Sequence, residues 1–281
     1  MLIRTWNLNR GHAHPAGVGN HVREMVSLIT TGGPDVVCLQ DVPAWALDAI
    51  GDWAQMQAVS VRARGARVGP LPAPARVGRL LSAPHSGLLS AAFAGRGNVI
   101  LIPAEANLRA TSTITLNTNV FCEERGAQLG LSPKEVRRWE RERRICHLVH
   151  YELPNRRRFL VATLHATSNP SDIRLAEAEL RRATHFVDRH AEVEEIVIVA
   201  GDFNLARAQS AAIAELESLP PESRWDDRGA HVDQVLLRGA SAASARVWTN
   251  AERTLRGRLL SDHYPIEIVI DLRPRGGLRP A

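Results

Sequence analysis

Five consecutive apolar residues, Ile196 to Ala200, constrain the fold of this chain more than any other feature. A strand with no polar residue at alternate positions is covered on both of its faces. One helical stretch precedes this run at about residues 172–190, and another follows at about 207–219. The run is therefore expected to be a central strand of an α/β protein.

Other segments predict strands of mixed type. Strand-like runs at Leu2–Leu8 and at 34–41 flank a helical stretch near residues 18–31. Residues 111–120 alternate polar and apolar side chains, which is typical of a half-exposed antiparallel strand. Further strands are expected at 97–103, 145–153, 159–167, 231–237 and 265–272. The mixture predicts a layered sandwich.

Length and composition are those of one globular domain. The chain has 281 residues, of which 44% are hydrophobic and 23% charged, and sandwiches of this length commonly form one domain. We expect one catalytic domain over residues 1–272 and a loose tail over 273–281. Residues 62–87 predict a long surface loop, which is either functional or a poorly ordered insertion.

Cellular context follows from the same composition. The chain shows no secretory leader and no apolar run long enough to span a bilayer. Its three separated cysteines predict reduced, structural thiols. We therefore expect a cytoplasmic monomer without a stable membrane anchor.

Basic charge comes almost entirely from arginine. The formal net charge is +5, and Lys134 is the only lysine beside 34 arginines. Arginine suits bidentate phosphate contacts, but a GC-rich genome would produce the same bias. A capping box at Ser132–Glu135 predicts the start of a helix that continues to Arg144. The basic face of this helix is either solvated or in contact with substrate phosphates.

Polar side chains with metal-binding chemistry stand at the ends of the predicted strands. They are Asn7, Asp41, His165, Asp202, Asn204, Asp233, Asp262 and His263. Strand ends of α/β proteins converge, so residues far apart in sequence can meet there. Taken singly, Asp and Asn are equally typical of turns and caps. Together, their oxygens suit a hard cation such as Mg²⁺, and the unpaired cysteines argue against structural zinc.

The order of the motifs around these residues resembles one known family. The motifs are Thr5-Trp6-Asn7, Val37-Cys38-Leu39-Gln40-Asp41, Thr163-Leu164-His165, Gly201-Asp202-Phe203-Asn204, His231-Val232-Asp233-Gln234-Val235 and Ser261-Asp262-His263-Tyr264-Pro265. This series is similar to the endonuclease/exonuclease/phosphatase family, and it extends from residue 5 to about residue 270. Gly-Asp-Phe-Asn and Ser-Asp-His are highly specific in combination, the Trp-Asn and Leu-Gln-Asp motifs are supportive, and the Val-Asp-Gln motif is weak alone.

The resemblance implies a DNase I-like fold. This fold is a four-layered α/β sandwich, in which two mixed β-sheets pack face to face with helices on the outside and the site lies at one edge. By the same resemblance, Asn7, Asp41 and Asp262 would hold a catalytic Mg²⁺, for which Mn²⁺ could substitute. The family usually has Glu where this chain has Asp41, so direct ligation and ligation through a water both remain open there.

The resemblance also implies roles for the remaining motif residues. Asp202, oriented near Asn204, would activate the attacking water. His165 and His263 would contact the phosphate oxygens, and Asp233 would fix the tautomer of His263. The reaction would be an in-line displacement without a covalent intermediate. Substrate-binding residues outside this set are not identified by the sequence.

Three functions are compatible with these residues. The first is a Mg²⁺-dependent nuclease that hydrolyses phosphodiester bonds of nucleic acid, which the basic charge favours. The second is a phosphatase or phosphodiesterase acting on a small or lipid phosphate ester, such as a phosphoinositide or a sphingomyelin-like diester. The third is an inactive binding module, for which the complete set of acidic and His residues would have no purpose. Endo- or exo-action and pathway are not specified by the sequence.

Overall fold

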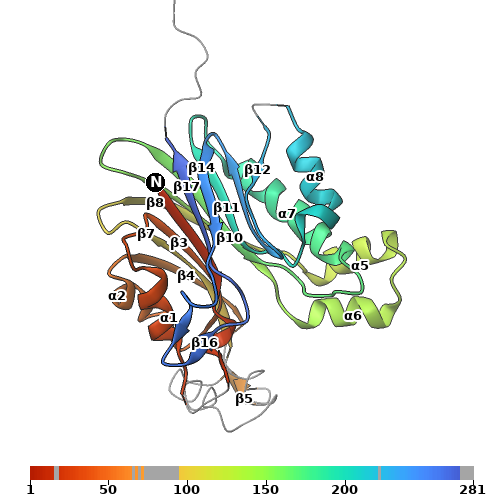
Figure 1. The fold of residues 1–281 in the computed structure, drawn as a ribbon. Coiled ribbons are helices and arrows are strands. Elements are labelled where there is room, and N and C mark those ends of the chain that lie inside the picture. The colour runs from red at the N-terminus through yellow and green to blue at the C-terminus, as the bar shows by residue number, and fades with distance from the viewer. Residues whose placement is uncertain (16–18, 65–66, 69–70, 73–94, 221–222, 273–281) are drawn as a thin grey trace, which may run out of the picture.

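The computed structural model describes residues 1–281 with the exception of 16–18, 65–66, 69–70, 73–94, 221–222 and 273–281. Two six-stranded sheets lie face to face in the described part, and helices cover their outer faces (Figure 1). The layer order is therefore helix, sheet, sheet, helix. The four-layered α/β sandwich predicted from the sequence is confirmed.

The first sheet has the order β14-β17-β1-β3-β7-β4. Its strands are β1 (Leu2–Asn7), β3 (Val36–Pro43), β4 (Gln57–Arg64), β7 (Arg96–Ile102), β14 (Ser241–Val247) and β17 (Ile266–Asp271). β1 and β3 are parallel, whereas the other neighbouring pairs are antiparallel. The sheet is mixed, as expected.

The second sheet has the order β12-β13-β11-β10-β9-β8. Its strands are β8 (Asn107–Thr115), β9 (Ile145–Glu152), β10 (Arg158–His165), β11 (Ile196–Asp202), β12 (Asp226–Asp227) and β13 (Asp233–Arg238). Only β10 and β11 pair in parallel within this sheet. Each sheet thus contains one parallel pair.

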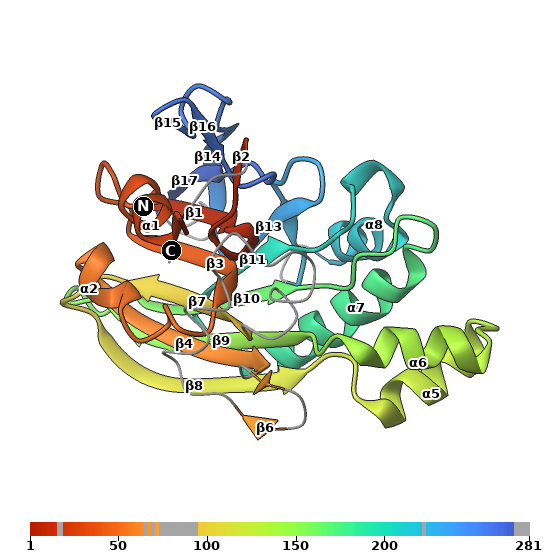
Figure 2. The same cartoon turned by 90° about the horizontal axis from the view of Figure 1, so that it is seen from below.

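Helices and short elements complete the layers. α1 (Val22–Ile29) and α2 (Ile50–Ala54) cover the first sheet, and α7 (Arg174–His190) and α8 (Ala211–Ser218) cover the second (Figure 2). α5 (Asn119–Gln128) and α6 (Pro133–Arg141) pack against α7. The short elements are η1 (Asn9–Gly11), η2 (Arg207–Gln209), β2 (Ala13–His14), β5 (Arg67–Val68), β6 (Leu71–Pro72), β15 (Thr254–Leu255) and β16 (Arg258–Leu260).

The position of β11 between two apolar cores explains why its sequence is apolar throughout. Val197 and Val199 point into the core beneath the helices, whereas Ile198 and Ala200 point into the core between the two sheets. Burying a Val or Ile side chain contributes about 1.5–3 kcal/mol. A polar residue at any of these positions would lose this contribution and lack a hydrogen-bond partner.

The structure corrects the strand prediction at two places: one predicted strand ends early at a helix cap, and one edge strand was missed. The strand predicted for residues 111–120 ends at Thr115, because the Thr118 hydroxyl accepts a hydrogen bond from the Phe121 N–H and begins α5. β14 was not predicted, because its Ser- and Ala-rich sequence has low strand propensity and four of its residues are exposed at the sheet edge. Pairing with β17 stabilises it instead.

The capping box predicted at Ser132 is present, but α6 is shorter than predicted. The Asn117 side chain accepts a hydrogen bond from the Arg144 N–H and donates to the carbonyls of Trp139 and Glu142. Asn117 therefore satisfies the carboxyl end of the helix, which stops at Arg141.

The prediction of a loop over residues 62–87 is wrong at its start, because β4 continues to Arg64 and β5 pairs with β6. The rest of that loop and the predicted tail over 273–281 lie outside the described residues. Among the residues that the structure describes, no helix has the length and apolarity needed to cross a bilayer.

Candidate functional site

Strand register brings the motif residues to one edge of the sandwich. In the parallel pair β10–β11, His165 lies opposite Asp202, and in the antiparallel pair β11–β13, Asp202 lies opposite Asp233. Figure 2 looks onto this edge from below. Asn7 ends β1 in the facing sheet, so residues from both sheets meet here. The predicted convergence of strand ends is observed.

Gly201 permits the close approach of β10 and β11 at this edge. Its φ is +153°, and a Cβ at this position would lie 2.1 Å from the Leu164 carbonyl oxygen. No other residue type fits without displacing the strand. The glycine of the Gly-Asp-Phe-Asn motif therefore places Asp202 beside His165.

Asp202 is the centre of the site, and its side chain is 1% exposed. The Asn7 Nδ2 group donates to its Oδ2 at 2.8 Å, and His165 Nε2 lies 3.3 Å from the same oxygen. His263 Nε2 lies 3.7 Å from it, and the Asn204 N–H donates to Oδ1 at 3.0 Å. Burial raises the pKa of Asp202, although His263 and Asn7 oppose the rise. A carboxylate held this way is suited to accept a proton.

His263 forms an ion pair with Asp233. Its Nδ1 lies 3.0 Å from Asp233 Oδ2. Burial lowers the pKa of His263, but the bond to Asp233 and the charges of Asp233, Asp202 and Asp262 outweigh burial and raise the pKa to about 9. Burial also raises the pKa of Asp233, against the effect of that bond. At neutral pH the imidazole is therefore charged and can donate from Nε2 towards the site.

His165 differs in charge from His263. Burial and then the positive charges of Arg144 and Arg96 hold the pKa of His165 well below its ordinary value. The ring is neutral at physiological pH as a result. The two histidines thus present one neutral and one charged imidazole to the same carboxylate.

Several residues that support this site were not identified from the sequence. Ser261 Oγ donates to the Asn7 carbonyl at 2.7 Å and accepts from the His263 N–H at 3.1 Å. Trp6 Nε1 donates to the His263 carbonyl at 3.0 Å. Arg253, which is 2% exposed, donates to the Ser261 carbonyl at 2.7 Å. Ser261 and Trp6 belong to recognised motifs, but no local pattern marks Arg253.

The three predicted metal ligands occupy different environments. Asn7 contacts Asp202, as described above. Asp41 lies between two arginines, with Arg10 Nε 3.2 Å from Oδ2 and Arg96 Nη1 3.4 Å from Oδ1. Its φ of 50° is unusual for a residue other than glycine. Asp262 is exposed and raises the pKa of His263 through its charge.

The donor set at this edge fits a hard divalent cation. Carboxylate oxygens of Asp202 and Asp233 lie within 4.8 Å of one another. Asp233 Oδ1 is buried and has no hydrogen-bond partner in the described part of the chain. Exposed Asp262 supplies a further carboxylate. Asp41 is the exception, because arginines already neutralise its charge.

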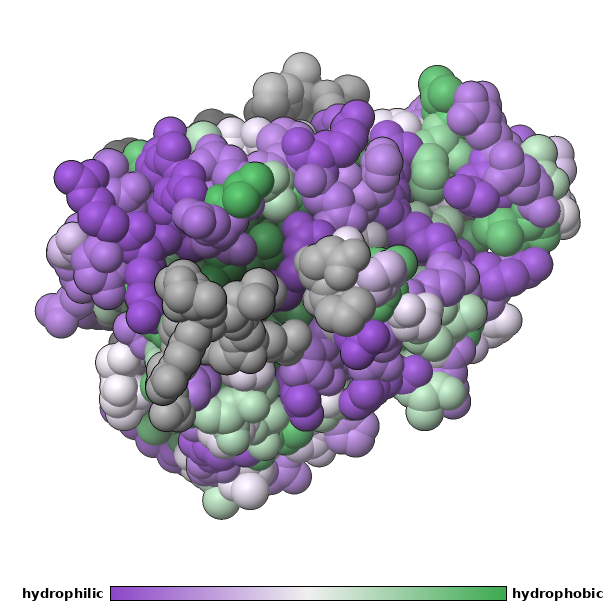
Figure 3. All heavy atoms as spheres, turned by 90° about the horizontal axis from the view of Figure 1, so that it is seen from above, coloured by the Kyte–Doolittle hydropathy of each residue, from purple (hydrophilic) through white to green (hydrophobic). Residues whose placement is uncertain are grey.

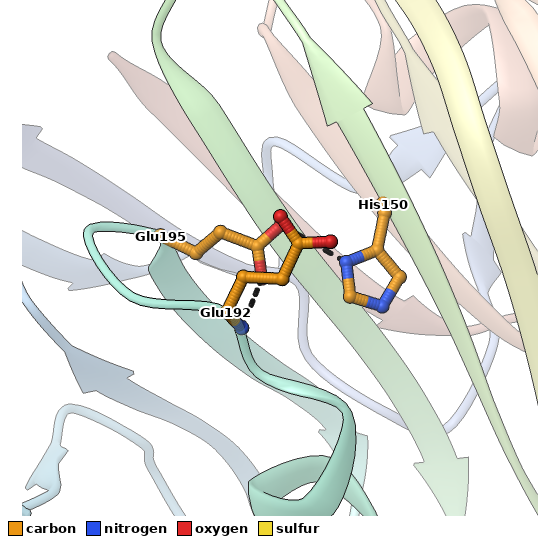
Figure 4. A group of neighbouring side chains, drawn as sticks. All are labelled: His150, Glu192 and Glu195. Carbon is orange, nitrogen blue, oxygen red and sulfur yellow. Dashed lines mark hydrogen bonds and ion pairs between the residues drawn. The ribbon is translucent and has the colours of Figure 1, made fainter.

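A second group of potential ligands lies at the opposite edge, where β10 and β11 begin. Figure 4 shows His150 pointing towards Glu195, with Nδ1 2.9 Å from Oε1. Glu192 Oε2 accepts hydrogen bonds from Arg109 at 3.0 Å and Arg158 at 2.9 Å. Glu192 is therefore already paired with two arginines, and Glu195 with His150 and the Glu192 N–H. We interpret this group as a structural network of polar contacts.

The same edge is mostly hydrophilic. Figure 3 shows separate apolar spots on the described part of this face and no extended apolar patch there. The exposed large apolar residues are likewise scattered, and Val193 is the most exposed at 84%. Isolated residues of this kind are ordinary for a protein surface.

A sequence profile described as the Endonuclease/Exonuclease/phosphatase family matches residues 5–263. The chain belongs to this family. Membership in the endonuclease/exonuclease/phosphatase family makes it a hydrolase that acts on phosphate ester bonds, as expected from the motifs. A search of curated proteins finds no match to the chain.

Solved structures share the fold of this family member. An endonuclease/exonuclease/phosphatase from Beutenbergia cavernae is 15% identical with a TM-score of 0.64, covering 96% of this chain and 71% of the other. The human Nocturnin catalytic domain is 14% identical with a TM-score of 0.62, covering 96% and 93%. TDP2 from D. rerio, complexed with a single-strand DNA product, is 15% identical with a TM-score of 0.61, covering 96% and 98%.

Proposed function

We propose that this phosphoesterase is a nuclease that hydrolyses phosphodiester bonds of nucleic acid with a divalent metal, preferably Mg²⁺. The observation that carries the proposal is the buried Asp202 carboxylate, which contacts Asn7, a neutral histidine and a charged histidine. The basic surroundings of His165 suit a polyanionic substrate. The DNA product bound to the similar fold of D. rerio TDP2 supports this substrate class.

The proposed reaction is an in-line attack of water on phosphorus, which breaks the P–O ester bond opposite the water and releases an alcohol that takes its proton from solvent. Asp202 accepts the proton of the attacking water, and the Asn204 N–H orients its carboxylate. His263, charged through Asp233, donates a hydrogen bond to a phosphate oxygen and stabilises the negative charge of the transition state. Neutral His165 donates to a second phosphate oxygen without repelling the neighbouring arginines.

Asn7 and Asp262 are the residues that we propose to hold the metal directly. When bound, Mg²⁺ would act as a Lewis acid on the phosphate oxygens. We propose that Asp41 contributes through a water, because Arg10 and Arg96 occupy its two oxygens. Its shorter side chain would then serve to orient the arginines as well as the water.

The proposal is tested by metal-dependent hydrolysis of a substrate panel. The panel contains plasmid DNA, single-stranded DNA, RNA, an abasic duplex, inositol phosphates and a generic phosphodiester. We expect turnover of a nucleic acid with Mg²⁺ or Mn²⁺ and its loss with EDTA. Turnover of inositol phosphates alone would contradict the proposed substrate.

Matched variants separate chemistry from folding. Asp202→Asn keeps the shape of the side chain but removes the proton acceptor, so activity is expected to fall about 10²–10⁴-fold. Asp52→Asn, on the exposed face of α2, makes the same change away from the site and is expected to retain full activity. Equal activity in both variants would contradict the role of Asp202.

A further inference from the structure

Arg253 is a buried arginine whose guanidinium contacts backbone carbonyls, an amide and an aromatic ring, and no carboxylate among the described residues. It lies in the turn between β14 and β15 (Figure 2), and it is 2% exposed. Its Nε group has no hydrogen-bond partner in the described part of the chain. A buried charge is costly unless polar groups compensate it. Carbonyl dipoles and the ring provide that compensation here.

The guanidinium is enclosed by the Ser-Asp-His loop, which comprises residues 260–264. Its Nη1 group faces three backbone carbonyls of this loop. They belong to Leu260 at 3.2 Å, Ser261 at 2.7 Å and His263 at 3.3 Å. The ring of Tyr264 completes the enclosure, with its centroid 4.1 Å from Arg253 Cζ. The buried charge is therefore a common donor for the backbone of the motif.

Ser261 needs such a donor, because its backbone has a conformation that glycine adopts more readily than serine. Its φ is 57°, and a left-handed residue other than glycine is strained. The turn directs the Ser261 carbonyl to Arg253 and the Ser261 hydroxyl to the Asn7 carbonyl at 2.7 Å. Without the guanidinium, buried carbonyls of the loop would lose their donor, and the strained turn would relax. Arg253 thus stabilises the conformation of the Ser-Asp-His loop.

His263 is the side chain whose position depends on this turn. Its Nδ1 lies 3.0 Å from Asp233 Oδ2, and its Nε2 lies 3.7 Å from Asp202 Oδ2. Its carbonyl accepts from Trp6 Nε1 at 3.0 Å and from Arg253 Nη1 at 3.3 Å. Both carboxylates belong to strands of the second sheet, so they would not follow a movement of the loop. A displaced loop would therefore separate the imidazole from both of its partners.

Arg253 is fixed by the turn that precedes it. Its Nη2 group donates to Asn250 Oδ1 at 2.7 Å. Within this turn, Glu252 Oε2 accepts from the Thr249 N–H at 2.7 Å, and the Thr249 hydroxyl accepts from the Glu252 N–H at 3.4 Å. Reciprocal bonds of this kind restrict the backbone. The guanidinium can therefore hold the Ser-Asp-His loop in one position, and it does more than fill the space beneath the loop.

We propose that Arg253 is a positioning residue of this hydrolase, which holds the Ser-Asp-His loop so that His263 faces the reacting phosphate. The inference rests on the proposed role of His263 in the hydrolysis of a phosphate ester. Arg253 is too deeply buried to touch a substrate, so it acts through the backbone of the loop. Its loss should therefore slow the chemical step more than it weakens substrate binding.

Kinetics with the ester that the substrate panel identifies test this role. Arg253→Ala is expected to lower kcat about 10²-fold and to change KM little, because a displacement of about 1 Å in an active site has an effect of this size. Arg258→Ala is the matched control, since Arg258 belongs to the same hairpin and donates to the Pro15 carbonyl at 2.8 Å. It should keep the kcat of the wild type. An unchanged kcat in Arg253→Ala, or a rise in KM alone, would overturn the inference.

Chemical rescue separates positioning from a general loss of structure. Guanidinium chloride, far below the concentration that unfolds the protein, should occupy the space left in Arg253→Ala and restore part of kcat, whereas the same concentration of sodium chloride should not. Equal restoration by both salts would overturn the inference. If Arg253→Ala fails to fold, as judged by circular dichroism, Arg253→Lys replaces it. A single ammonium group cannot serve Asn250 and the loop carbonyls together, so kcat should still fall, and a wild-type kcat would overturn the inference.

A proton resonance of His263 tests the inference without turnover. In protein with isotopically labelled histidine, the Nδ1 proton that His263 shares with Asp233 is identified by its loss in Asp233→Asn. We expect this signal to shift or disappear in Arg253→Ala or Arg253→Lys and to remain in Arg258→Ala. An unchanged signal in the Arg253 variants would overturn the positioning role. A changed signal without hydrolysis of any nucleic acid would support that role and contradict the proposed nuclease function alone.

Discussion

At the scale of single residues, the proposed activity depends on the protonation state of His263. His263 is needed in its charged form, so activity should be present below its pKa and lost as pH rises through about 9. Asp233→Asn removes the charge that stabilises the imidazolium. We expect the alkaline limb of kcat/KM to move down by about one to two pH units. Measuring kcat/KM against pH for both proteins, with the substrate that the panel identifies, tests this shift. An alkaline limb at the same pH in the variant would contradict the role of Asp233 in keeping His263 charged.

A second prediction at the same scale concerns stability away from the site. Asp227 is fully buried, its Oδ2 has no hydrogen-bond partner in the described residues and only a 3.9 Å ion pair with Arg207 Nε, and burial raises its pKa to about 6. Its stabilising contribution is therefore present below its unfolded pKa of about 3.9 and is lost as pH rises through 6. Asp227→Asn should raise the free energy of unfolding by about 1–2 kcal/mol at pH 8 and not at pH 4. Urea unfolding at both pH values checks this, with partly exposed Asp226→Asn as the control.

At the scale of elements, Glu179 on α7 joins α6 to the loop that follows β10. It accepts hydrogen bonds from Trp139 Nε1 and from the Thr167 N–H, each at 2.6 Å. Trp139→Phe removes one donor and should lower the free energy of unfolding by about 1–3 kcal/mol beyond the loss of packing. Trp225→Phe is the matched control, because the buried Trp225 N–H has no partner among the described residues. Equal losses in the two variants would contradict a specific role for the Glu179 bond.

At the scale of the whole molecule, Gln40 links the two sheets. Its Nε2 donates to Thr5 Oγ1 at 3.0 Å within the first sheet and to Thr163 Oγ1 at 2.9 Å in the second. Gln40→Met should cost about 2 kcal/mol of unfolding free energy, since it leaves two buried hydroxyl groups without this partner. The triple variant with Thr5→Val and Thr163→Val should recover most of the loss. Failure to recover would show that packing, and not hydrogen bonding, determines the cost.

The net charge of the whole molecule predicts how nucleic-acid binding depends on salt concentration. The chain carries +5 and 34 arginines, so nucleic-acid binding should release counterions. For about three neutralised phosphates of a single strand, the logarithm of the binding constant should fall with the logarithm of salt concentration with a slope of about −2. Fluorescence anisotropy with labelled single-stranded DNA measures the slope. A flat response would contradict a polyanionic substrate.

Much of the fold was predictable because its signals are local. The apolar run of β11 predicts burial on both faces, and the capping box at Ser132 marks the start of α6. Apart from the strand end that the local Thr118 cap decides, predictions were wrong for β14 and for the end of α6, where a nonlocal partner decides the structure. β14 forms only because β17 pairs with it, and α6 stops where Asn117, distant in sequence, satisfies its end.

The sequence by itself determined the family, the layered fold and the set of motif residues, because each motif carries its chemistry within a few positions. Only the tertiary structure decided how these residues are charged and paired. Asp41 contacts Arg10 and Arg96, and Arg144 is buried beside His165, across elements that no local pattern connects. Electrostatic energy depends on distance and burial in space, so the charge state of this site follows from packing and not from spacing along the chain.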